Sequence, residues 1–185
     1  PETKQRTVIY AHYSPELRAI IQEINVNSNN HYAEHLFRYL ALQKDSIASS
    51  KGAVAVIKTF WESKSLPVDE LFMYDGSGLT PVNAVSANFF VSLLSYMNSS
   101  PYSSDFFSSM AVAGEKGTLS SFLKSTTLSG KVQAKSGSIH RVKCYAGYIY
   151  IKKKKLTFAV MVNNPNGTLK AATKKMEEFL LSVSK

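Results

Sequence analysis

Residues 130–138 read GKVQAKSGS and end in the motif Lys135-Ser136-Gly137-Ser138, at the point where the character of the chain changes. From here on, β-branched and aromatic residues dominate, which is typical of strands. Three strand-like segments share this composition: 132–135, 142–151 and 156–163. Because the connections between them are short, the pattern predicts antiparallel pairing, with the motif at the end of the first strand.

Before this point, apolar residues recur at helical spacing, as in the series Ala33, Leu36, Phe37 and Leu40. The expected helical segments are one opened by Ser14-Pro15-Glu16, one from near His31, one over 51–62, one capped by Ser86, a turn near 104–110 and a short helix over 117–124. The apolar spacing also predicts a closing amphipathic helix over 168–182.

Three further segments are assigned from composition. Residues 7–11 predict a short strand, residues 25–30 a polar break, and Lys152–Lys155 a solvated hairpin turn. No internal repeat or linker divides the sequence, so residues 1–185 are expected to form a single piece. Helices that precede antiparallel strands and a closing helix indicate an α+β fold, with an antiparallel sheet flanked by helices.

The amino-acid composition limits which classes of protein and which partners are expected. The 185 residues are 44% hydrophobic, which is sufficient for a core. The net charge of +9 suits anionic partners such as nucleic acid, anionic lipid or an acidic wall polymer, and it is equally consistent with no specific partner. Nucleic acid is not expected as a partner, because the basic residues do not gather on an evident recognition helix or aromatic platform. The single cysteine, Cys144, lies in a strand pattern and is interpreted as a small buried hydrophobe.

Three short polar motifs are the candidates for chemistry: Ser28-Asn29-Asn30, Asp75-Gly76-Ser77-Gly78 and Lys135-Ser136-Gly137-Ser138. Each alone is typical of something plainer, a helix cap, a turn or an exposed loop. Their order is more informative, because a serine-x-asparagine motif that opens a helix precedes a lysine-serine-glycine motif on a strand. The Asp75–Gly78 segment is interpreted as a structural turn.

This combination resembles the penicillin-recognising serine peptidases, whose motif set is serine-x-x-lysine, a Ser-Asp-Asn type motif and Lys-Thr-Gly. Within them the chain is similar to the D-Ala-D-Ala carboxypeptidase/endopeptidase family, the class C low-molecular-mass penicillin-binding proteins. The supporting stretches are 27–34, 75–79, 113–119, 130–138, 146–148 and 158–159. The resemblance implies a partial penicillin-binding-protein/β-lactamase-like fold, with the chain as the C-terminal part of a transpeptidase-like domain.

The chain departs from the family pattern in two ways. Ser136 stands where the family usually has threonine, which keeps the hydroxyl. No serine-x-x-lysine motif precedes Ser28, so the resemblance implies that the nucleophile lies in a missing N-terminal segment and that this chain alone is inactive. Ser121-Phe122-Leu123-Lys124 matches the serine-x-x-lysine pattern, but it follows the Ser28-Asn29-Asn30 motif and its helix is expected to end within a turn. It is interpreted as a surface helix.

The resemblance implies a serine-type D-Ala-D-Ala carboxypeptidase that acts on peptidoglycan stem peptides through an acyl-enzyme, with an endopeptidase preference left open. Ser28 would relay a proton and Lys135 would place a cation in the cleft. The expected substrate-binding residues are Asn30, Ser136, Gly137 and the backbone N–H of Ser138, an oxyanion donor. The implied partners are stem peptides ending in D-Ala-D-Ala, β-lactams as acylating inhibitors, and the missing N-terminal half. No cofactor is expected, and the implied location is periplasmic or extracytoplasmic, in a bacterium.

Two other functions remain open on the sequence. A non-catalytic module that binds wall peptides could use the same fold and the basic surface. A zinc peptidase is the other alternative, because His31, Glu34 and His35 spell a histidine-x-x-glutamate-histidine pattern. The helical stripe of Ala33 and Phe37 argues against it, since His31 and His35 are expected to face solvent on the opposite side.

Overall fold

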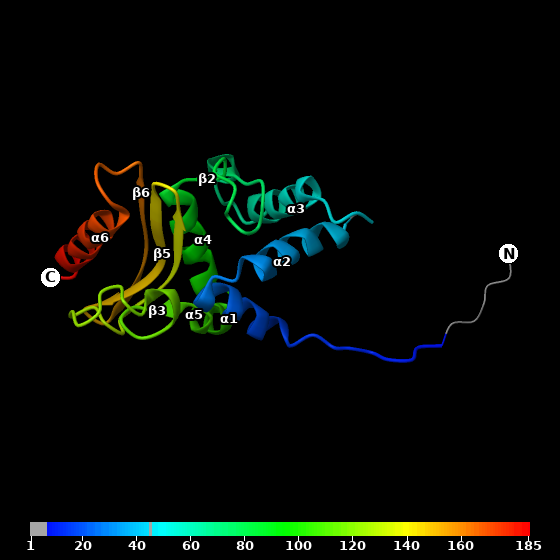
Figure 1. The fold of residues 1–185 in the computed structure, drawn as a ribbon, viewed down its shortest axis with the longest axis horizontal. Coiled ribbons are helices and arrows are strands. Elements are labelled where there is room, and N and C mark those ends of the chain that lie inside the picture. The colour runs from blue at the N-terminus through cyan, green and yellow to red at the C-terminus, as the bar shows by residue number, and fades with distance from the viewer. Residues whose placement is uncertain (1–6, 45) are drawn as a thin grey trace.

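The computed structural model describes residues 7–44 and 46–185, which form a sheet lobe and a helical lobe (Figure 1). The sheet lobe holds β3–β6 with α4 and α6, and the helical lobe holds α1–α3. The elements are α1 (Leu17–Asn27), α2 (Asn30–Leu42), α3 (Ser50–Glu62), η1 (Val68–Glu70), β1 (Leu71–Phe72), β2 (Ala84–Val85), α4 (Ala87–Ser99), α5 (Ser103–Ser108), β3 (Ala111–Val112), η2 (Gly117–Leu119), β4 (Val132–Ile139), β5 (Val142–Ile151), β6 (Lys154–Asn163) and α6 (Leu169–Val183).

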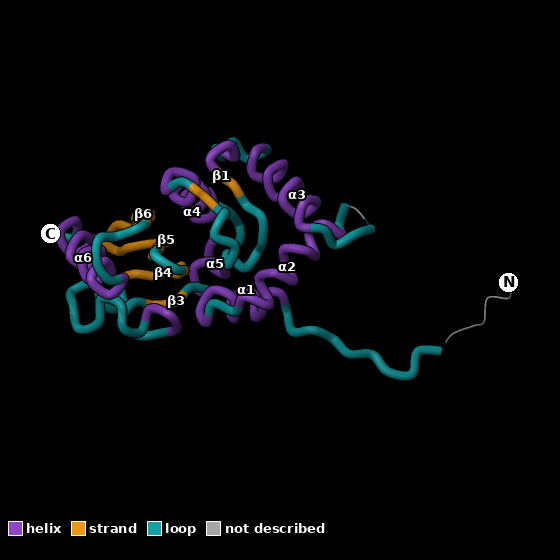
Figure 2. Tube along the Cα trace, turned by 45° about the horizontal axis from the view of Figure 1, so that its top comes forward, coloured by secondary structure: helices purple, strands orange, loops and turns teal. Residues whose placement is uncertain are grey.

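The main sheet is antiparallel, with strand order β3-β4-β5-β6 (Figure 2). Strand β4 pairs with β5 along its whole length, from Val132 to Ile139. Strand β3 pairs only with Gln133 and Ala134. Among the described residues, the outer edge of β4 therefore has no strand partner from Lys135 onward. The predicted α+β class and the antiparallel order of the three long strands are confirmed.

Helices cover both faces of the sheet, α6 on one and α4 on the other (Figure 1). Side chains alternate along a strand, so Tyr145 and Ile149 of β5 pack with Met176 of α6 in the largest core cluster. Tyr148 points the other way and packs with Leu94 of α4. Its hydroxyl donates to the Leu94 carbonyl at 2.8 Å, which satisfies a buried donor, and burial raises the pKa of Tyr148 to about 12.

The helical lobe has a smaller core of its own. Helices α2 and α3 pack through Phe37, Ala41 and Ala53. Ser86 caps α4, as predicted, by accepting a hydrogen bond from the N–H of Phe89 at 2.9 Å. In the part of the chain that the structure describes, no helix has the length and apolar character needed to cross a membrane.

The predictions at the start of the chain need correction. Residues 7–11 form no strand, because no neighbouring strand among the described residues offers them hydrogen-bond partners. The first helix begins at Leu17 rather than Ser14, since the N–H of Ala19 closes the first turn on the carbonyl of Glu16 at 2.9 Å. The polar break over 25–30 is also wrong, and it shrinks to Ser28 and Asn29.

That helix continues to Asn27 because its polar residues have partners outside the backbone ladder. The amide of Asn25 donates to the Ser109 hydroxyl at 2.9 Å, and the amide of Asn27 donates to the Glu23 carboxylate at 2.7 Å. Side chains bonded in this way do not compete for the helix backbone. The consequence is a sharp junction of two residues between α1 and α2.

Two predictions in the second half also change. The helix expected over 117–124 is a short 3-10 turn that ends at Leu119, and Leu123 has a left-handed φ of 54°. The turn expected over Lys152–Lys155 involves only Lys152 and Lys153, with φ of 48° and 66°, because a tight hairpin needs two such residues. Lys154 already begins β6. Strands β1, β2 and β3, of two residues each, were not predicted.

Candidate active site

The junction between α1 and α2 sets the position of Ser28. Ser28 ends α1 in the left-handed conformation, with φ of 58° and ψ of 48°. Asn29 then caps α2 by accepting from the N–H of Tyr32 at 3.1 Å. A left-handed residue followed directly by an extended cap reverses the chain within two residues. The Ser28 hydroxyl is thereby held at the face of the helical lobe that meets the sheet.

Lys135 reaches this junction from β4. Its ammonium group donates to the Ser28 hydroxyl at 2.7 Å and to the carbonyl of Ser136 at 2.6 Å. The two partners Lys135 and Ser28 lie 107 residues apart in the chain. The structure thus brings together the first and third polar motifs, and the bond crosses the boundary between the lobes.

The Lys135 ammonium is a largely buried cation. Burial, together with the positive charge of Lys143, lowers the pKa of Lys135 to about 8. Within the described residues no carboxylate forms an ion pair with Lys135. A buried cation without a counter-ion is costly. The site therefore favours an anionic ligand, which would supply the missing charge.

The outer edge of β4 offers backbone groups beside this cation. The carbonyl of Val132 accepts from the N–H of Ala113 on that outer side, at 2.9 Å. Hydrogen-bonding direction alternates along an antiparallel strand, so Ser136 and Ser138 also direct their N–H and C=O groups outward. No strand covers them among the described residues. An extended peptide could pair with this edge.

Thr118 also belongs to the site, although the sequence analysis did not single it out. It lies in η2, and its hydroxyl is 2.9 Å from that of Ser136. In this bond the Ser136 hydroxyl donates to Thr118, so Thr118 fixes the orientation of the Ser136 hydroxyl in the site. Thr118 falls in the stretch 113–119 that supports the family resemblance, but that stretch assigned it no role, and the packing of η2 beside β4 brings it to the site.

The Asp75–Gly78 loop forms the opposite wall. The Asp75 carboxylate accepts from the N–H groups of Gly78 at 2.5 Å and Thr80 at 2.9 Å, which confirms a turn. The N–H of Gly76 donates to the Glu34 carboxylate at 2.8 Å. These bonds fix the loop on α2. The sequence analysis identified the turn but missed that it lines the cleft.

Together these elements enclose a cleft of about 340 Å³ between the lobes. All six residues proposed from the sequence line it, in company with the loop. The lining residues are Ile24, Asn25, Ser28, Asn29, Asn30, Ala33, Gly76, Ser77, Gly78, Leu79, Lys135, Ser136, Gly137, Ser138 and Ile139. One side is the β4 edge, and the other is the α1–α2 junction with the Asp75–Gly78 loop.

Residues 1–183 match the D-Ala-D-Ala carboxypeptidase 3 (S13) family. The chain belongs to the S13 family. It is 28% identical over 165 residues to D-alanyl-D-alanine carboxypeptidase from Actinomadura sp., covering 86% of this chain and 31% of that protein. It is 28% identical over 178 residues to the carboxypeptidase DacB from Haemophilus influenzae, covering 93% of this chain and 37% of the relative. This S13 chain thus spans about a third of the length of these curated relatives.

Solved structures show the same fold. Penicillin binding protein 4 from Haemophilus influenzae, complexed with a β-lactam, superposes with a TM-score of 0.84 at 22% identity, covering 90% of this chain and 41% of that one. A predatory endopeptidase from Bdellovibrio bacteriovorus, in complex with an immunity protein, gives 0.74 at 20% identity, with 91% and 43% covered. The predicted penicillin-binding-protein-like fold of this S13 chain is confirmed.

The side chains of the histidine-x-x-glutamate-histidine pattern in the S13 chain are exposed or bonded to protein groups. His31 and His35 are both exposed, and the ring of His35 bonds the His31 carbonyl at 2.7 Å. Glu34 accepts from Arg38 at 2.7 Å and from Gly76, which hold the pKa of its carboxyl below the usual range although burial opposes them. Among the described residues, no three histidine, cysteine or acidic side chains gather as a metal site.

Ser121 and Lys124, the other serine-x-x-lysine letters, are exposed and do not lie on one helix. The left-handed φ of Leu123 between them breaks the helical register that a paired serine and lysine require. The prediction of a surface position is confirmed, and the prediction of a helix is wrong. These letters form no second site.

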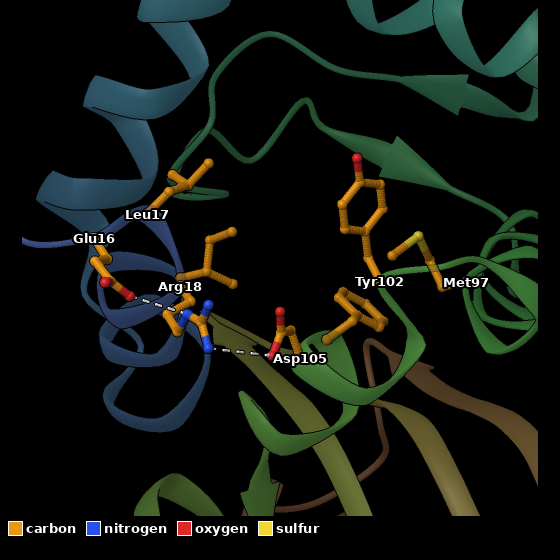
Figure 3. A pocket seen from close by; sticks show the side chains of 8 residues that line it. Glu16, Leu17, Arg18, Met97, Tyr102 and Asp105 are labelled. Carbon is orange, nitrogen blue, oxygen red and sulfur yellow. Dashed lines mark ion pairs between the residues drawn. The ribbon is translucent and has the colours of Figure 1, made fainter.

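A separate hollow of about 510 Å³ lies where α1 approaches α5 (Figure 3). Its walls include Leu17, Met97 and Tyr102, and Arg18 bridges Glu16 at 3.1 Å and Asp105 at 3.9 Å. The hollow is mainly apolar and holds neither Ser28 nor Lys135. The residues expected to carry the chemistry therefore line the cleft between the lobes and not this larger hollow.

Proposed function

We propose that the protein is a serine-type D-Ala-D-Ala peptidase that acts on peptidoglycan stem peptides through an acyl-enzyme and is acylated by β-lactams. The observation that carries the proposal is the hydrogen bond from Lys135 to Ser28, in a cleft bordered by the free edge of β4. Membership of the S13 family supports it. The attacking serine and its lysine are proposed to lie outside these 185 residues, in the N-terminal part of the transpeptidase-like domain.

In the proposed reaction, the hydroxyl of the attacking serine adds to the carbonyl of the penultimate D-alanine. The C–N bond then breaks, and the terminal D-alanine leaves with a proton on its nitrogen. Ser28 would pass the proton of the attacking hydroxyl to that nitrogen, and the Lys135 ammonium would keep the Ser28 oxygen polarised. Water then hydrolyses the ester and regenerates the serine.

Substrate binding is assigned to the β4 edge. The peptide would lie antiparallel to it, with its carbonyl oxygen on the N–H of Ser138, a donor worth roughly 3–4 kcal/mol in the transition state. Lys135 and the Ser136 hydroxyl would bind the terminal carboxylate. Asn30 would hold a peptide group with its amide. Gly137 would allow close approach, since it presents no side chain.

Cleavage of a terminal D-alanine and cleavage within a cross-linked peptide differ in one respect at this site. In a carboxypeptidase substrate, the group that leaves is a single terminal D-alanine, whose free carboxylate would lie beside Lys135. In an endopeptidase substrate, the group that leaves belongs to a second peptide branch. The S13 relatives are described as carboxypeptidases, and the neighbours from Bdellovibrio bacteriovorus as endopeptidases. We propose carboxypeptidase activity, with the peptidoglycan and an extracytoplasmic location as its setting.

Labelling with a fluorescent penicillin, followed by intact mass, tests the proposal. The full-length protein is expected to gain one covalent adduct, and the 185-residue chain alone is expected to gain none. An adduct on the chain alone would show that the nucleophile lies within it. A full-length protein that never labels, although it binds wall peptides, would instead favour a non-catalytic binding module.

A further inference from the structure

A groove of about 780 Å³ lies outside the cleft, on the α6 face of the sheet. Its floor is the stacked pair Phe122 and Tyr145, whose ring centroids are 4.0 Å apart. Its walls are η2, β5 and the first turns of α6. The lining residues are Thr118, Ser121, Phe122, Lys143, Tyr145, Thr168, Lys170, Ala171, Thr173, Lys174 and Glu177. Apart from Thr118, which contacts Ser136, no residue of this groove has a role in the proposed acyl transfer.

Its charge is positive. Lys143, Lys170 and Lys174 line it, against the single carboxylate of Glu177. That carboxylate is already engaged, because it accepts from the N–H of Leu123 at 2.6 Å. In the described part of the chain, none of the three lysines has an acidic side chain at ion-pair distance.

Lys143 is the most enclosed of these cations. It lies two positions before Tyr145 on β5 and therefore on the same face of the sheet. Its ammonium sits 5.1 Å from the centre of the Tyr145 ring. Burial lowers the pKa of Lys143. The aromatic ring attracts the ammonium group and holds it in place, so the positive charge has a defined position in the groove.

The groove adjoins the proposed substrate cleft. Thr118 lines the groove, Ser136 lines the cleft, and their hydroxyl oxygens are 2.9 Å apart. A peptide that leaves the β4 edge past this pair of hydroxyls enters the groove directly. Lysines and hydroxyls are the donors that bind carboxylates. The large volume suits several residues of chain rather than one small ion.

We propose that this groove is a second binding site, which takes the carboxylate-bearing part of an acidic peptide. It extends the proposed function, because it gives the protein a contact with its substrate away from the scissile bond. It does not depend on acyl transfer, so the groove can bind where the reaction fails. The anchors are Lys143 and Lys174, with the hydroxyl of Thr168 beside them.

The test is a titration of the full protein with end-blocked triglutamate, measured by isothermal titration calorimetry. The double variant Lys143→Gln/Lys174→Gln is expected to bind about tenfold more weakly or worse, since hydrogen bonds to charged groups are lost. The matched control is Lys152→Gln/Lys153→Gln, which removes the same charge from the exposed β5–β6 turn. It is expected to change affinity less than about twofold. End-blocked triglutamine is expected not to bind.

An equal loss in both double variants would overturn the proposal in favour of general surface charge. Equal binding of triglutamine would overturn the charge basis, and binding of glycerol phosphate without triglutamate would overturn the peptide assignment. Lys174→Gln alone, on the exposed side of α6, repeats the test if the double variant unfolds. Penicillin labelling of the same variants separates the two proposals, because triglutamate binding without labelling contradicts the proposed function only.

Discussion

Lys135 of β4 and Ser28 at the α1–α2 junction are joined by a 2.7 Å hydrogen bond that crosses the boundary between the two lobes. The bond exists because a left-handed residue reverses the chain at Ser28 and because β4 projects beyond its partner β3. Their meeting places a buried cation and a polarised hydroxyl on the rim of one cleft.

The first prediction is that Ser28 and Lys135 act as a unit. In the full protein, Ser28→Ala and Lys135→Ala should each slow penicillin acylation by about 10²- to 10⁴-fold, as for a group that moves a proton. The double variant should be little slower than the worse single variant, because each change already breaks the shared hydrogen bond. Stopped-flow labelling measures the rates. Ser104→Ala and Lys152→Ala, both exposed, are the matched controls; fully additive losses would contradict the coupling.

The second prediction concerns pH. Because burial lowers the pKa of Lys135 to about 8, the cation is lost as pH rises through that value. Attraction of the penicillin carboxylate, and with it the acylation rate, should fall between about pH 7 and 9. Lys135→Arg should be slower at neutral pH but should show no such fall, because guanidinium keeps its proton. A fall of the same size in Lys135→Arg would remove Lys135 as its source.

The third prediction tests Thr118, the residue that the sequence did not reveal. Thr118→Val keeps the shape and removes the hydroxyl next to Ser136, so acylation should slow by up to about tenfold, the value of one ordinary hydrogen bond. Thr118→Ser should retain most of the rate. Thermal unfolding of both variants provides the check on folding. Equal rates in the valine and serine variants would show that Thr118 does not orient Ser136.

The fold could be predicted from the sequence where the pattern is local. The three long strands and the closing helix follow from composition and spacing, and Ser86 marks its helix start. The two-residue strands β1, β2 and β3 could not be predicted, because so few residues carry no period. Residues 7–11 have strand composition but no partner among the described residues, and composition alone cannot supply one.

The residues of the site also fall into those that local motifs predict and those that they do not. Ser28, Asn30 and the Lys135–Ser138 motif were predicted as a group, and all of them line the cleft. Thr118 and the wall role of the Asp75–Gly78 loop were missed, because both depend on contacts between distant parts of the chain. The Glu34 contact with Gly76 spans 42 residues. Such contacts are decided by packing, which short motifs do not record.

The last prediction contrasts two glycines of the cleft. At Gly76 an added Cβ would meet the Phe37 side chain and lie 2.8 Å from the Ala33 carbonyl oxygen, so the loop could not rest on α2. Gly76→Ala should lower the free energy of unfolding by about 1–3 kcal/mol, as overpacking does. At Gly137 the nearest atom to an added Cβ is that of Cys144, at an ordinary 3.7 Å.

Gly137→Ala should therefore unfold at the denaturant midpoint of the wild type and yet acylate about tenfold to a hundredfold more slowly, because the new methyl group displaces the substrate from the β4 edge. Urea unfolding and penicillin labelling of the two variants give the comparison. A destabilised Gly137→Ala variant would mean that the edge is packed rather than open. A stable Gly137→Ala variant with the full labelling rate would mean that the substrate does not approach β4 at this residue.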